Sequence, residues 1–260
     1  MGEPSLKDLL SVAIDAAVLG GRRTLAYFNC GVQVEIKADQ TPVTRADREC
    51  EEIIRGCIQR YFPTHAIIGE EAGSSDGDPH YRWIIDPIDG TKTFIHGVPF
   101  YGVLIGIEVQ GQAAVGVIYL PALDELISAA SGLGCQWNGR SARVSDVKKM
   151  DEAVLLTTST TASAARSDAY ERLAARTKLH RTWGDCYGYA LVATGRAEIM
   201  LDPDMKPWDS APLLPILTEA GGKFTTWDGR ATIWGNDAVA TNAELSEEVL
   251  GILKSEVRRK

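Results

Sequence analysis

The acidic residues Asp86 and Asp89 follow a short apolar run and precede a Gly-Thr step in the segment 81–91. Residues 83–85, Trp-Ile-Ile, predict a short buried strand, and Pro87 is expected to end it because proline lacks a backbone donor. The two carboxylates would then face one point at the strand end, where Asp86 can bridge two hard cations and Asp89 can bind one of them. This spacing indicates metal chemistry on a phosphate.

Gly90 and Thr91 open the next segment, which runs to His96. If this segment begins as a helix, its free N–H groups and the positive end of its dipole face the same point and offer a place for a phosphate. A plainer interpretation is a turn with a helix cap, in which Asp89 or Thr91 accepts backbone N–H bonds. Taken alone, the stretch fits both interpretations, and the rest of the chain has to decide between them.

Composition narrows the class of protein. A chain of 260 residues can form one large domain or two packed lobes, and 45% hydrophobic with 24% charged residues is ordinary for a globular protein. The formal net charge of −8 argues against a nucleic-acid-binding protein and favours small-molecule partners. No apolar run is long enough to span a bilayer and the first residues lack a signal-peptide pattern, so a cytoplasmic protein is expected.

The cysteines and histidines predict neither disulfides nor zinc. The five cysteines are scattered and form no C-x-x-C pair, so free, mostly buried thiols are expected. The four histidines form no cluster with them, which argues against a zinc site.

Further acids lie beside predicted elements. Glu70 and Glu71 follow a short strand at 66–69, and Asp47 has capping-box spacing from Thr44 at the start of a predicted helix. Asp209 precedes an apolar helix at 210–220, where an N-cap is the simpler explanation.

Hydrophobic periodicity predicts two αβ lobes, residues 1–150 and 151–260. The meander at 101–109, 113–120 and 125–130 indicates a mostly antiparallel central sheet. A helix with Ser5 and Asp8 in capping spacing is expected to open the chain, and a strand with one wet face is expected at 32–37. Further helices are expected at 168–176, within 183–195, at 210–220 and from 244, with strands at 154–158, 197–201 and 238–241. Residues 74–79 are expected to form a surface loop.

Three motifs in order, Gly69-Glu70-Glu71, Asp86-Pro-Ile-Asp89-Gly-Thr91, and Trp208-Asp209 followed by Glu219-Ala-Gly-Gly222, resemble the inositol monophosphatase family. This family comprises magnesium-dependent, lithium-sensitive phosphomonoesterases, and the resemblance covers nearly the whole chain. It implies a layered αβαβα fold, a homodimer, and two or three Mg²⁺ ions per site, with Mn²⁺ able to substitute.

Carried over by position, the resemblance gives the metal ligands as Glu70, Asp86, the carbonyl of Ile88, Asp89 and Asp209. It implies that Thr91 orients the attacking water with Asp47 as its partner, and that Lys37 lies close to the metals beside the catalytic Glu70. Gly90 and Thr91 would offer backbone N–H groups to the phosphate. Converging carboxylates repel one another unless cations neutralise them, so a metal-loaded site with a metal-activated water is expected.

The substrate prediction depends on Gly184-Asp185-Cys186 with Tyr189, and on Asp202. Asp209, further along the chain, is expected to contact the substrate as well as the metal. This pattern resembles the histidinol-phosphate phosphatases of the family. Asp185 lies where inositol-specific relatives carry a small neutral residue, and an additional acid there favours a cationic substrate such as histidinol phosphate. Asp185 could instead cap the helix that follows it.

The expected function is therefore hydrolysis of histidinol phosphate to histidinol and phosphate, in histidine biosynthesis. The alternatives are an inositol-1-monophosphatase, a broad phosphatase of small metabolites, or a sugar-diphosphate or nucleotide phosphatase, for which no basic cluster is evident. A non-catalytic regulator with the same fold is the remaining alternative.

Overall fold

The computed structural model describes residues 3–255 of the chain. Its helices are α1 (Leu6–Thr24), α2 (Arg45–Tyr61), α3 (Thr91–Ile95), α4 (Thr160–Arg166), α5 (Ala169–Ala174), α6 (Asp185–Ala193), α7 (Pro207–Ser210), α8 (Leu213–Glu219) and α9 (Ser246–Lys254), with a 3₁₀ turn at Met150–Glu152. Its strands in the first part of the chain are β1 (Val34–Ile36), β2 (Pro42–Thr44), β3 (His65–Gly69), β4 (Gly73–Ser75), β5 (Asp78–Asp89), β6 (Gly102–Val109), β7 (Gln112–Leu120), β8 (Glu125–Ala130), β9 (Gly134–Trp137) and β10 (Arg140–Ser141). Those that follow are β11 (Val154–Leu156), β12 (Leu179–Arg181), β13 (Ile199–Asp202), β14 (Lys223–Thr225) and β15 (Ala238–Thr241).

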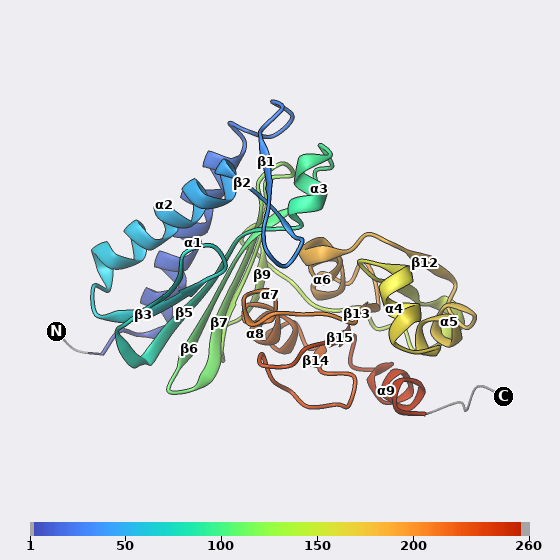
Figure 1. The fold of residues 1–260 in the computed structure, drawn as a ribbon. Helices are drawn as coiled ribbons and strands as arrows, with labels where there is room; N and C mark the ends of the chain where they lie inside the picture. The colour runs from blue at the N-terminus through green and yellow to red at the C-terminus, as the bar shows by residue number, and fades with distance from the viewer. Residues whose placement is uncertain (1–2, 256–260) are drawn as a thin grey trace.

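Two sheets alternate with three helical layers (Figure 1). The eight-stranded sheet has the order β10-β9-β8-β7-β6-β5-β3-β4, and only its β3–β5 pair is parallel. The five-stranded sheet has the order β12-β11-β13-β15-β14. Helices α1 and α2 cover one face of the large sheet, α6 and α8 lie between the sheets, and α5 and α9 cover the outer face of the small sheet. The αβαβα layering and the mostly antiparallel central sheet are thus confirmed.

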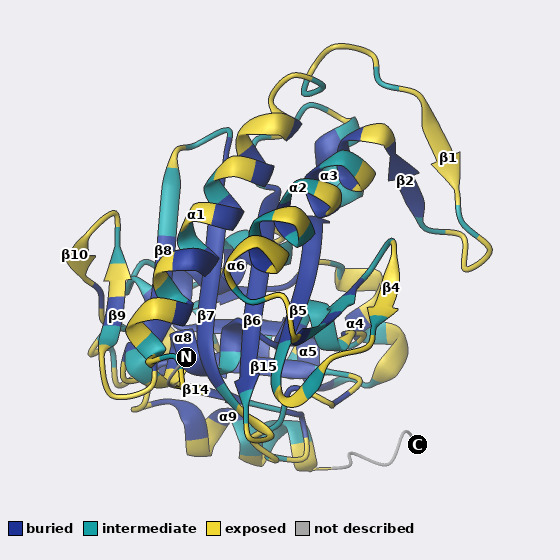
Figure 2. Cartoon of the chain, turned by 90° about the vertical axis from the view of Figure 1, so that its left-hand side faces the viewer, coloured by how far each residue is buried: buried dark blue, intermediate teal, exposed yellow. Residues whose placement is uncertain are grey.

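The nearly continuous apolar sequences of β6 and β7 explain why the large sheet is buried on both faces (Figure 2). Odd-numbered residues such as Val103, Ile105 and Val117 pack with α1 and α2, whereas Leu104 and Ile118 pack with α6 and α8. Alternate side chains of a strand point to opposite faces, so each strand supplies both cores. The core between the two sheets contains residues from both sides of position 150, such as Leu104 and Leu156. The division into lobes 1–150 and 151–260 stays a prediction.

The capping signals read from the sequence form as predicted. Ser5 and Asp8 make the capping box of α1, and Thr44 and Asp47 make that of α2. Helix α1 continues through Gly20 and Gly21. A Cβ at Gly20 would lie 2.8 Å from Ile54 and one at Gly21 would lie 2.6 Å from Tyr119, so neither position has room for a side chain. These glycines let α1 approach both α2 and the sheet.

The strand that carries the first two acids differs from the prediction. Strand β5 begins at Asp78 and passes through Pro87 to Asp89, so Pro87 does not end it. The predicted loop at 74–79 shrinks to residues 76 and 77, because residues 74 and 75 belong to β4 and residues 78 and 79 to β5. The register shifts between Asp86, opposite Leu104, and Asp89, opposite Gly102. Three residues of β5 therefore span two of β6, and this extra residue is where a proline is tolerated in a sheet.

Two further predictions need correction. The predicted strand at 32–37 shortens to β1, and all three of its residues are exposed, so it has no buried face and pairs only with β2. The helix predicted at 210–220 begins only at Leu213, as α8, and a separate short helix, α7, ends at Ser210, with Ala211 and Pro212 between the two.

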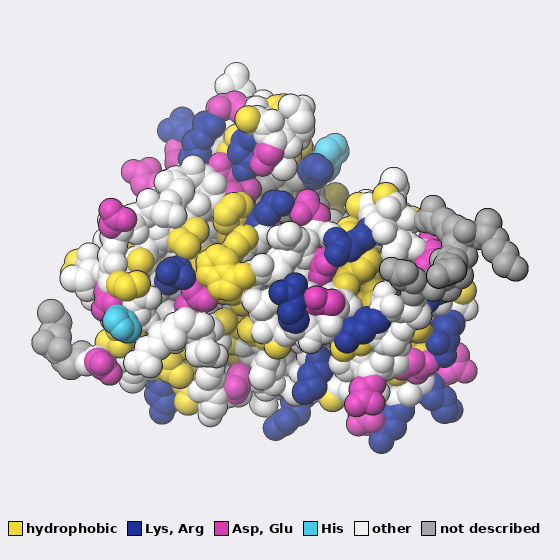
Figure 3. All heavy atoms as spheres, turned by 60° about the horizontal axis from the view of Figure 1, so that its bottom comes forward, with side chains coloured by type: hydrophobic (Ala, Val, Ile, Leu, Met, Phe, Trp, Pro, Cys, Tyr) yellow, Lys and Arg dark blue, Asp and Glu magenta, His cyan; other side chains and the backbone are white. Residues whose placement is uncertain are grey.

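One face of the molecule shows how its charged side chains are distributed. On the face drawn in Figure 3, Lys and Arg side chains lie interspersed with Asp and Glu, so the described residues of this face form no extended basic surface. Among residues 3–255, no helix combines the length and hydropathy that a membrane crossing requires.

Candidate metal centre and substrate pocket

Three carboxylates from two elements form the centre of the site. Asp86 and Asp89 come from the end of β5 and Asp209 comes from α7, and each offers an oxygen within 4.8 Å of the other two. Residues three apart on a regular strand point to opposite faces, but the extra residue in β5 brings Asp86 and Asp89 to the same side. The bulge at Pro87, rather than a turn beyond the strand, therefore creates the acid pair.

Glycines on the large sheet bring Asp209 to this pair. Gly106 and Gly116 lie opposite each other on β6 and β7, and a Cβ at either position would overlap the Ala211–Pro212 junction, at 2.4 Å and 2.1 Å. Because the junction packs directly on the sheet, α7 lies against β5 and β6. Asp209 is the third residue of α7, not the N-cap suggested by the sequence, and its Oδ2 accepts the backbone N–H of Lys206 at 2.7 Å.

The three acids repel one another in a setting that withdraws them from water. Burial, then the charges of Glu70, Asp89 and Asp209, raises the pKa of Asp86 well above its usual value. Burial also raises the pKa of Asp209 to about 7, although the hydrogen bond from Lys206 opposes the shift. Bound cations would relieve both effects, and an all-carboxylate donor set suits hard divalent ions. The residues present thus fit a divalent-metal site.

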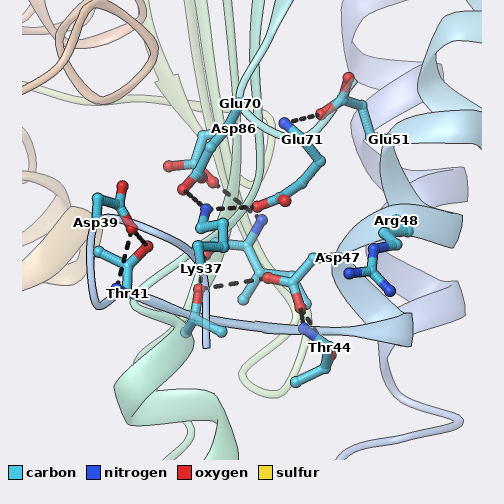
Figure 4. Close-up of polar contacts among 12 residues, drawn as sticks. Lys37, Asp39, Thr41, Thr44, Asp47, Arg48, Glu51, Glu70, Glu71 and Asp86 are labelled. Atoms are coloured by element: carbon cyan, nitrogen blue, oxygen red, sulfur yellow. Dashed lines mark hydrogen bonds and ion pairs between the residues drawn. The ribbon is translucent and has the colours of Figure 1, made fainter. Parts of the chain in front are cut away.

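Glu70 and Lys37 lie beside the three acids and pair with each other. The Nζ of Lys37 donates to Glu70 Oε1 at 2.6 Å and to Glu71 Oε1 at 2.9 Å (Figure 4). Burial disfavours the ammonium, but these two hydrogen bonds outweigh it and raise the pKa of Lys37. The structure therefore brings Glu70 close to Asp86 but holds its carboxylate on Lys37.

Thr91, Asp47 and Ile88 form a hydrogen-bonded group next to the acids. The Thr91 hydroxyl lies 3.3 Å from Asp47 Oδ1 and 3.1 Å from the Ile88 carbonyl, so its single proton can go to either acceptor. Thr44 donates its N–H and its hydroxyl to Asp47 Oδ2 at 2.8 and 2.6 Å. Burial raises the pKa of Asp47. Asp47 is thus both the predicted capping residue of α2 and a partner of Thr91.

Gly90 links the acid cluster to the substrate pocket. Its φ of +82° lies in the left-handed region, which glycine adopts without strain, and α3 begins at the next residue. A Cβ at Gly90 would lie 2.8 Å from Asp185 Oδ2. The helix predicted after Gly90 does form, although it is only five residues long.

Asp185 projects from α6 toward α3. Gly184, which has no capping side chain, is the N-cap of α6, so the alternative in which Asp185 caps this helix is wrong. The Thr93 hydroxyl donates to Asp185 Oδ2 at 2.8 Å, and Asp185 itself has a φ of +50°. Burial raises the pKa of the Asp185 carboxyl. The next residue, Cys186, donates its backbone N–H to Asp89 Oδ2.

Tyr189 and Asp202 lie deeper in the same pocket, which Asp89, Asp185 and Asp209 also line. The Tyr189 hydroxyl donates to Asp202 Oδ2 at 3.0 Å, and the Thr158 backbone N–H donates to Oδ1 at 3.0 Å. Burial raises the pKa of Asp202 to about 6. Both carboxylate oxygens of Asp202 therefore have protein partners, whereas Asp185 Oδ1 has none within the described part of the chain.

The structure adds roles that the sequence did not predict. Thr93 and Thr158 form hydrogen bonds with Asp185. Glu71 accepts from Lys37 together with Glu70. Glu51 accepts the backbone N–H groups of the residues that follow Glu70. Glu51 carried one usable signal, because it is an acid on the buried side of an amphipathic helix. Thr93 and Thr158 are ordinary polar residues whose roles depend on contacts far away in the sequence.

Comparisons with known proteins show which family the chain is similar to. The model of the inositol monophosphatase family matches residues 5–258. The chain is 41% identical over 248 residues to a histidinol-phosphatase of Chlorobaculum parvum, covering 94% of this chain and 96% of that protein. It is 32% identical over 250 residues to an inositol-1-monophosphatase of Mesorhizobium japonicum, with 93% and 94% covered.

A solved structure shows the same fold. The extragenic suppressor protein suhB from Bartonella henselae superposes with a TM-score of 0.89 at 30% identity, covering 96% of this chain and 99% of that one. Together with the acidic cluster, these similarities support a divalent-metal-dependent phosphatase that acts on small phosphorylated compounds. The chain belongs to the inositol monophosphatase family.

Proposed function

We propose that the protein is a Mg²⁺-dependent phosphomonoesterase that hydrolyses histidinol phosphate to histidinol and phosphate. The observation that carries this proposal is the position of Asp185, whose carboxylate lies against Gly90 at the edge of the metal centre and faces the substrate pocket. An acid at this point complements a substrate whose alcohol portion is cationic. The 41% identity to a histidinol-phosphatase supports the same conclusion.

The metal ligands would come from two elements, β5 and α7, and from the turn that follows β3. Glu70, Asp86, the carbonyl of Ile88, Asp89 and Asp209 would hold the cations, with Lys37 as a counter-charge that releases Glu70 when they bind. Bound Mg²⁺ ions would acidify a water molecule and neutralise charge on the phosphate and on the leaving oxygen.

Thr91 and Asp47 are suited to orient that water. If the Thr91 hydroxyl donates its hydrogen bond to Asp47, the lone pairs of its oxygen point elsewhere and can accept a hydrogen bond from the water. The hydrogen bonds from Thr44 fix the Asp47 carboxylate, and therefore the direction of the Thr91 hydroxyl. The backbone N–H groups of Gly90 and Thr91 would bind the phosphate oxygens. No residue of the chain has to become phosphorylated.

Asp185 and Asp202 divide the recognition of the alcohol portion. Among residues 3–255, Asp185 Oδ1 has no hydrogen-bond partner, so this oxygen would bind the substrate ammonium or imidazolium directly. Asp202 is satisfied by Tyr189 and Thr158, so its main effect is a negative field at the base of the pocket. Homodimer formation, lithium sensitivity, substitution of Mn²⁺ for Mg²⁺ and a cytoplasmic location remain predictions from the resemblance and the composition.

The test is a phosphate-release assay with Mg²⁺ over histidinol phosphate, inositol 1-phosphate, fructose 1,6-bisphosphate and 3′-phosphoadenosine 5′-phosphate. We expect the highest kcat/KM on histidinol phosphate. A preference for inositol 1-phosphate would replace the proposal with an inositol-monophosphatase function. Release from none of these compounds, by protein that binds Mg²⁺, would favour a non-catalytic regulator.

A further inference from the structure

Glu51 is a buried acid that lies outside the candidate metal ligands. It belongs to α2, and only 1% of its surface is exposed. Its Oε2 accepts the backbone N–H of Glu71 at 2.8 Å and its Oε1 accepts that of Ala72 at 3.1 Å. Arg55, one turn further along α2, donates Nε to Oε1 at 2.7 Å. A buried carboxylate is tolerated only with such partners, and here two of them are the backbone immediately after Glu70.

The residue before Glu70 is shaped to admit this contact. A Cβ at Gly69 would lie 2.1 Å from Glu51 Oε1, which is well inside van der Waals contact. The glycine therefore lets the carboxylate reach the backbone at the end of β3. Arg55 also donates to the carbonyl of Gly73, so the Glu51–Arg55 pair holds the turn from Glu70 to Gly73 at both of its ends.

The same turn presents two acids on its other side. Glu70 and Glu71 extend to Lys37, whereas the backbone of the turn is fastened to Glu51 (Figure 4). Glu70 also donates its N–H to the carbonyl of Ile85 in β5 at 3.2 Å, immediately before Asp86. The distance between the Glu70 and Asp86 backbones thus depends on the turn at 70–73, whose backbone N–H groups are hydrogen-bonded to Glu51 on the side away from Lys37.

We propose that Glu51 is a positioning residue of the metal centre, which fixes the Glu70–Ala72 backbone so that the Glu70 carboxylate can reach cations held by Asp86. This inference rests on the proposed ligand role of Glu70, but not on the identity of the substrate. Glu51 itself does not reach the reacting groups. Partners behind the ligands of a metal typically change metal affinity by about 10- to 100-fold when they are replaced.

The experiment compares Glu51→Gln with wild type and with Glu52→Gln, a matched change at the neighbouring exposed residue of α2. Mg²⁺ binding is measured by calorimetry without substrate, and hydrogen exchange is followed at the Glu71 and Ala72 amides. We expect Glu51→Gln to weaken Mg²⁺ binding about tenfold and to speed exchange at both amides, whereas Glu52→Gln changes neither. Wild-type Mg²⁺ affinity in a folded Glu51→Gln protein, even with a lowered melting temperature, would show a merely structural role.

Two further variants distinguish failure of the positioning role of Glu51 from failure of the ligand role of Glu70. Gly69→Ala keeps the acid but displaces it, and we expect the same loss of affinity as in Glu51→Gln. If neither variant folds in the absence of Mg²⁺, Glu51 serves folding and the proposal is wrong. Glu70→Gln tests the assumption beneath it: normal Mg²⁺ binding there would reject Glu70 as a ligand, whereas weak binding there with normal binding in Glu51→Gln would reject only the positioning role.

Discussion

The hydroxyl of Thr93 donates a hydrogen bond to Asp185 Oδ2 at 2.8 Å, although 92 positions separate the two residues in the chain. Thr93 lies on α3, directly after the acid cluster, and Asp185 opens α6 with a left-handed φ of +50°. The hydroxyl of Thr158 accepts the N–H of Asp185 at 2.8 Å, so both ends of this residue are held. Its carboxylate direction is therefore fixed before a substrate arrives.

This fixed acid predicts a change in selectivity when its charge is removed. Asp185→Asn keeps an oxygen that can accept from Thr93, but it removes the negative charge that complements a cationic alcohol. We expect kcat/KM on histidinol phosphate to fall about 10- to 100-fold, as for the loss of one charged hydrogen bond, with a much smaller change on inositol 1-phosphate. Steady-state assays on both esters measure the ratio.

A matched control comes from the same pocket. Asp204 also lines the pocket, but it is exposed and pairs with Lys206 at 2.9 Å. Asp204→Asn should leave the ratio within about twofold, because a solvated charge is screened. Equal losses on both esters in Asp185→Asn would mean that Asp185 supports the site without reading the substrate.

Asp86 is the acid with the strongest claim to a bridging position, since it is buried and close to Glu70, Asp89 and Asp209. Asp86→Asn should lower kcat/KM by about a hundredfold or more, because an amide cannot neutralise two cations. The metal-free protein should remain folded, since the change relieves repulsion. Near-normal turnover at saturating Mg²⁺ would remove Asp86 from the ligand set.

Thr91 is expected to matter mainly in the transition state. Thr91→Ala should reduce kcat about 10- to 100-fold with little change in KM, because the hydroxyl orients the nucleophile rather than the bound ester. Thr91→Ser keeps the hydroxyl and should recover most of the activity. If only KM changes in Thr91→Ala, Thr91 is a binding residue and the pairing with Asp47 has no catalytic purpose.

Metal removal should be visible without any assay of activity. Ligands that bind only the folded state raise the melting temperature, and here they would also neutralise Asp86, Asp89 and Asp209. We expect Mg²⁺ to raise the melting temperature of protein stripped with a chelator, and Asp86→Asn to lose most of this increase. Na⁺ at matched ionic strength is the control, since a general salt effect would act on both proteins equally.

Local signals predicted much of this molecule, and long-range contacts explain the misses. The capping boxes at Ser5 and Thr44 and the strand meander from β6 to β8 depend on residues close together in the sequence, so residue spacing alone predicts them. The passage of β5 through Pro87 depends on its pairing with β6, which no local pattern reveals. The break at Pro212 likewise depends on Gly106 and Gly116, which draw the chain onto the sheet.

The candidate site shows the same division. Asp86 and Asp89 could be singled out from their spacing at the end of a predicted strand, whereas Asp209 read locally as an N-cap and joined the ligand set only through the family resemblance. The structure brings all three together. Glu51 and Thr158 act through backbone N–H groups and hydroxyls of distant segments. Their importance follows from the fold, so a single sequence carries almost no signal for it.

His65 provides a prediction on stability that is independent of the metal centre. Its ring is buried and lies stacked between Phe62 and Tyr81, with centroid distances of 4.7 and 4.5 Å. Trp83 Nε1 donates to His65 Nδ1 at 3.0 Å, which requires an unprotonated Nδ1. Burial accordingly lowers the pKa of His65 below its usual value of 6.5.

The sign of the pH dependence follows from proton binding. Below about pH 6.5 the unfolded chain binds a proton at His65, whereas the folded protein keeps the ring neutral down to its lower pKa. The contribution of the neutral ring to the free energy of unfolding is therefore complete above about pH 6.5. It is lost as the pH falls toward the folded pKa. His65→Gln can still accept from Trp83 but does not titrate. We expect the free energy of unfolding, measured with urea in chelator, to fall more steeply from pH 7.5 to 5.5 in wild type than in His65→Gln. Identical slopes in the two proteins would contradict the assignment of a neutral, buried His65.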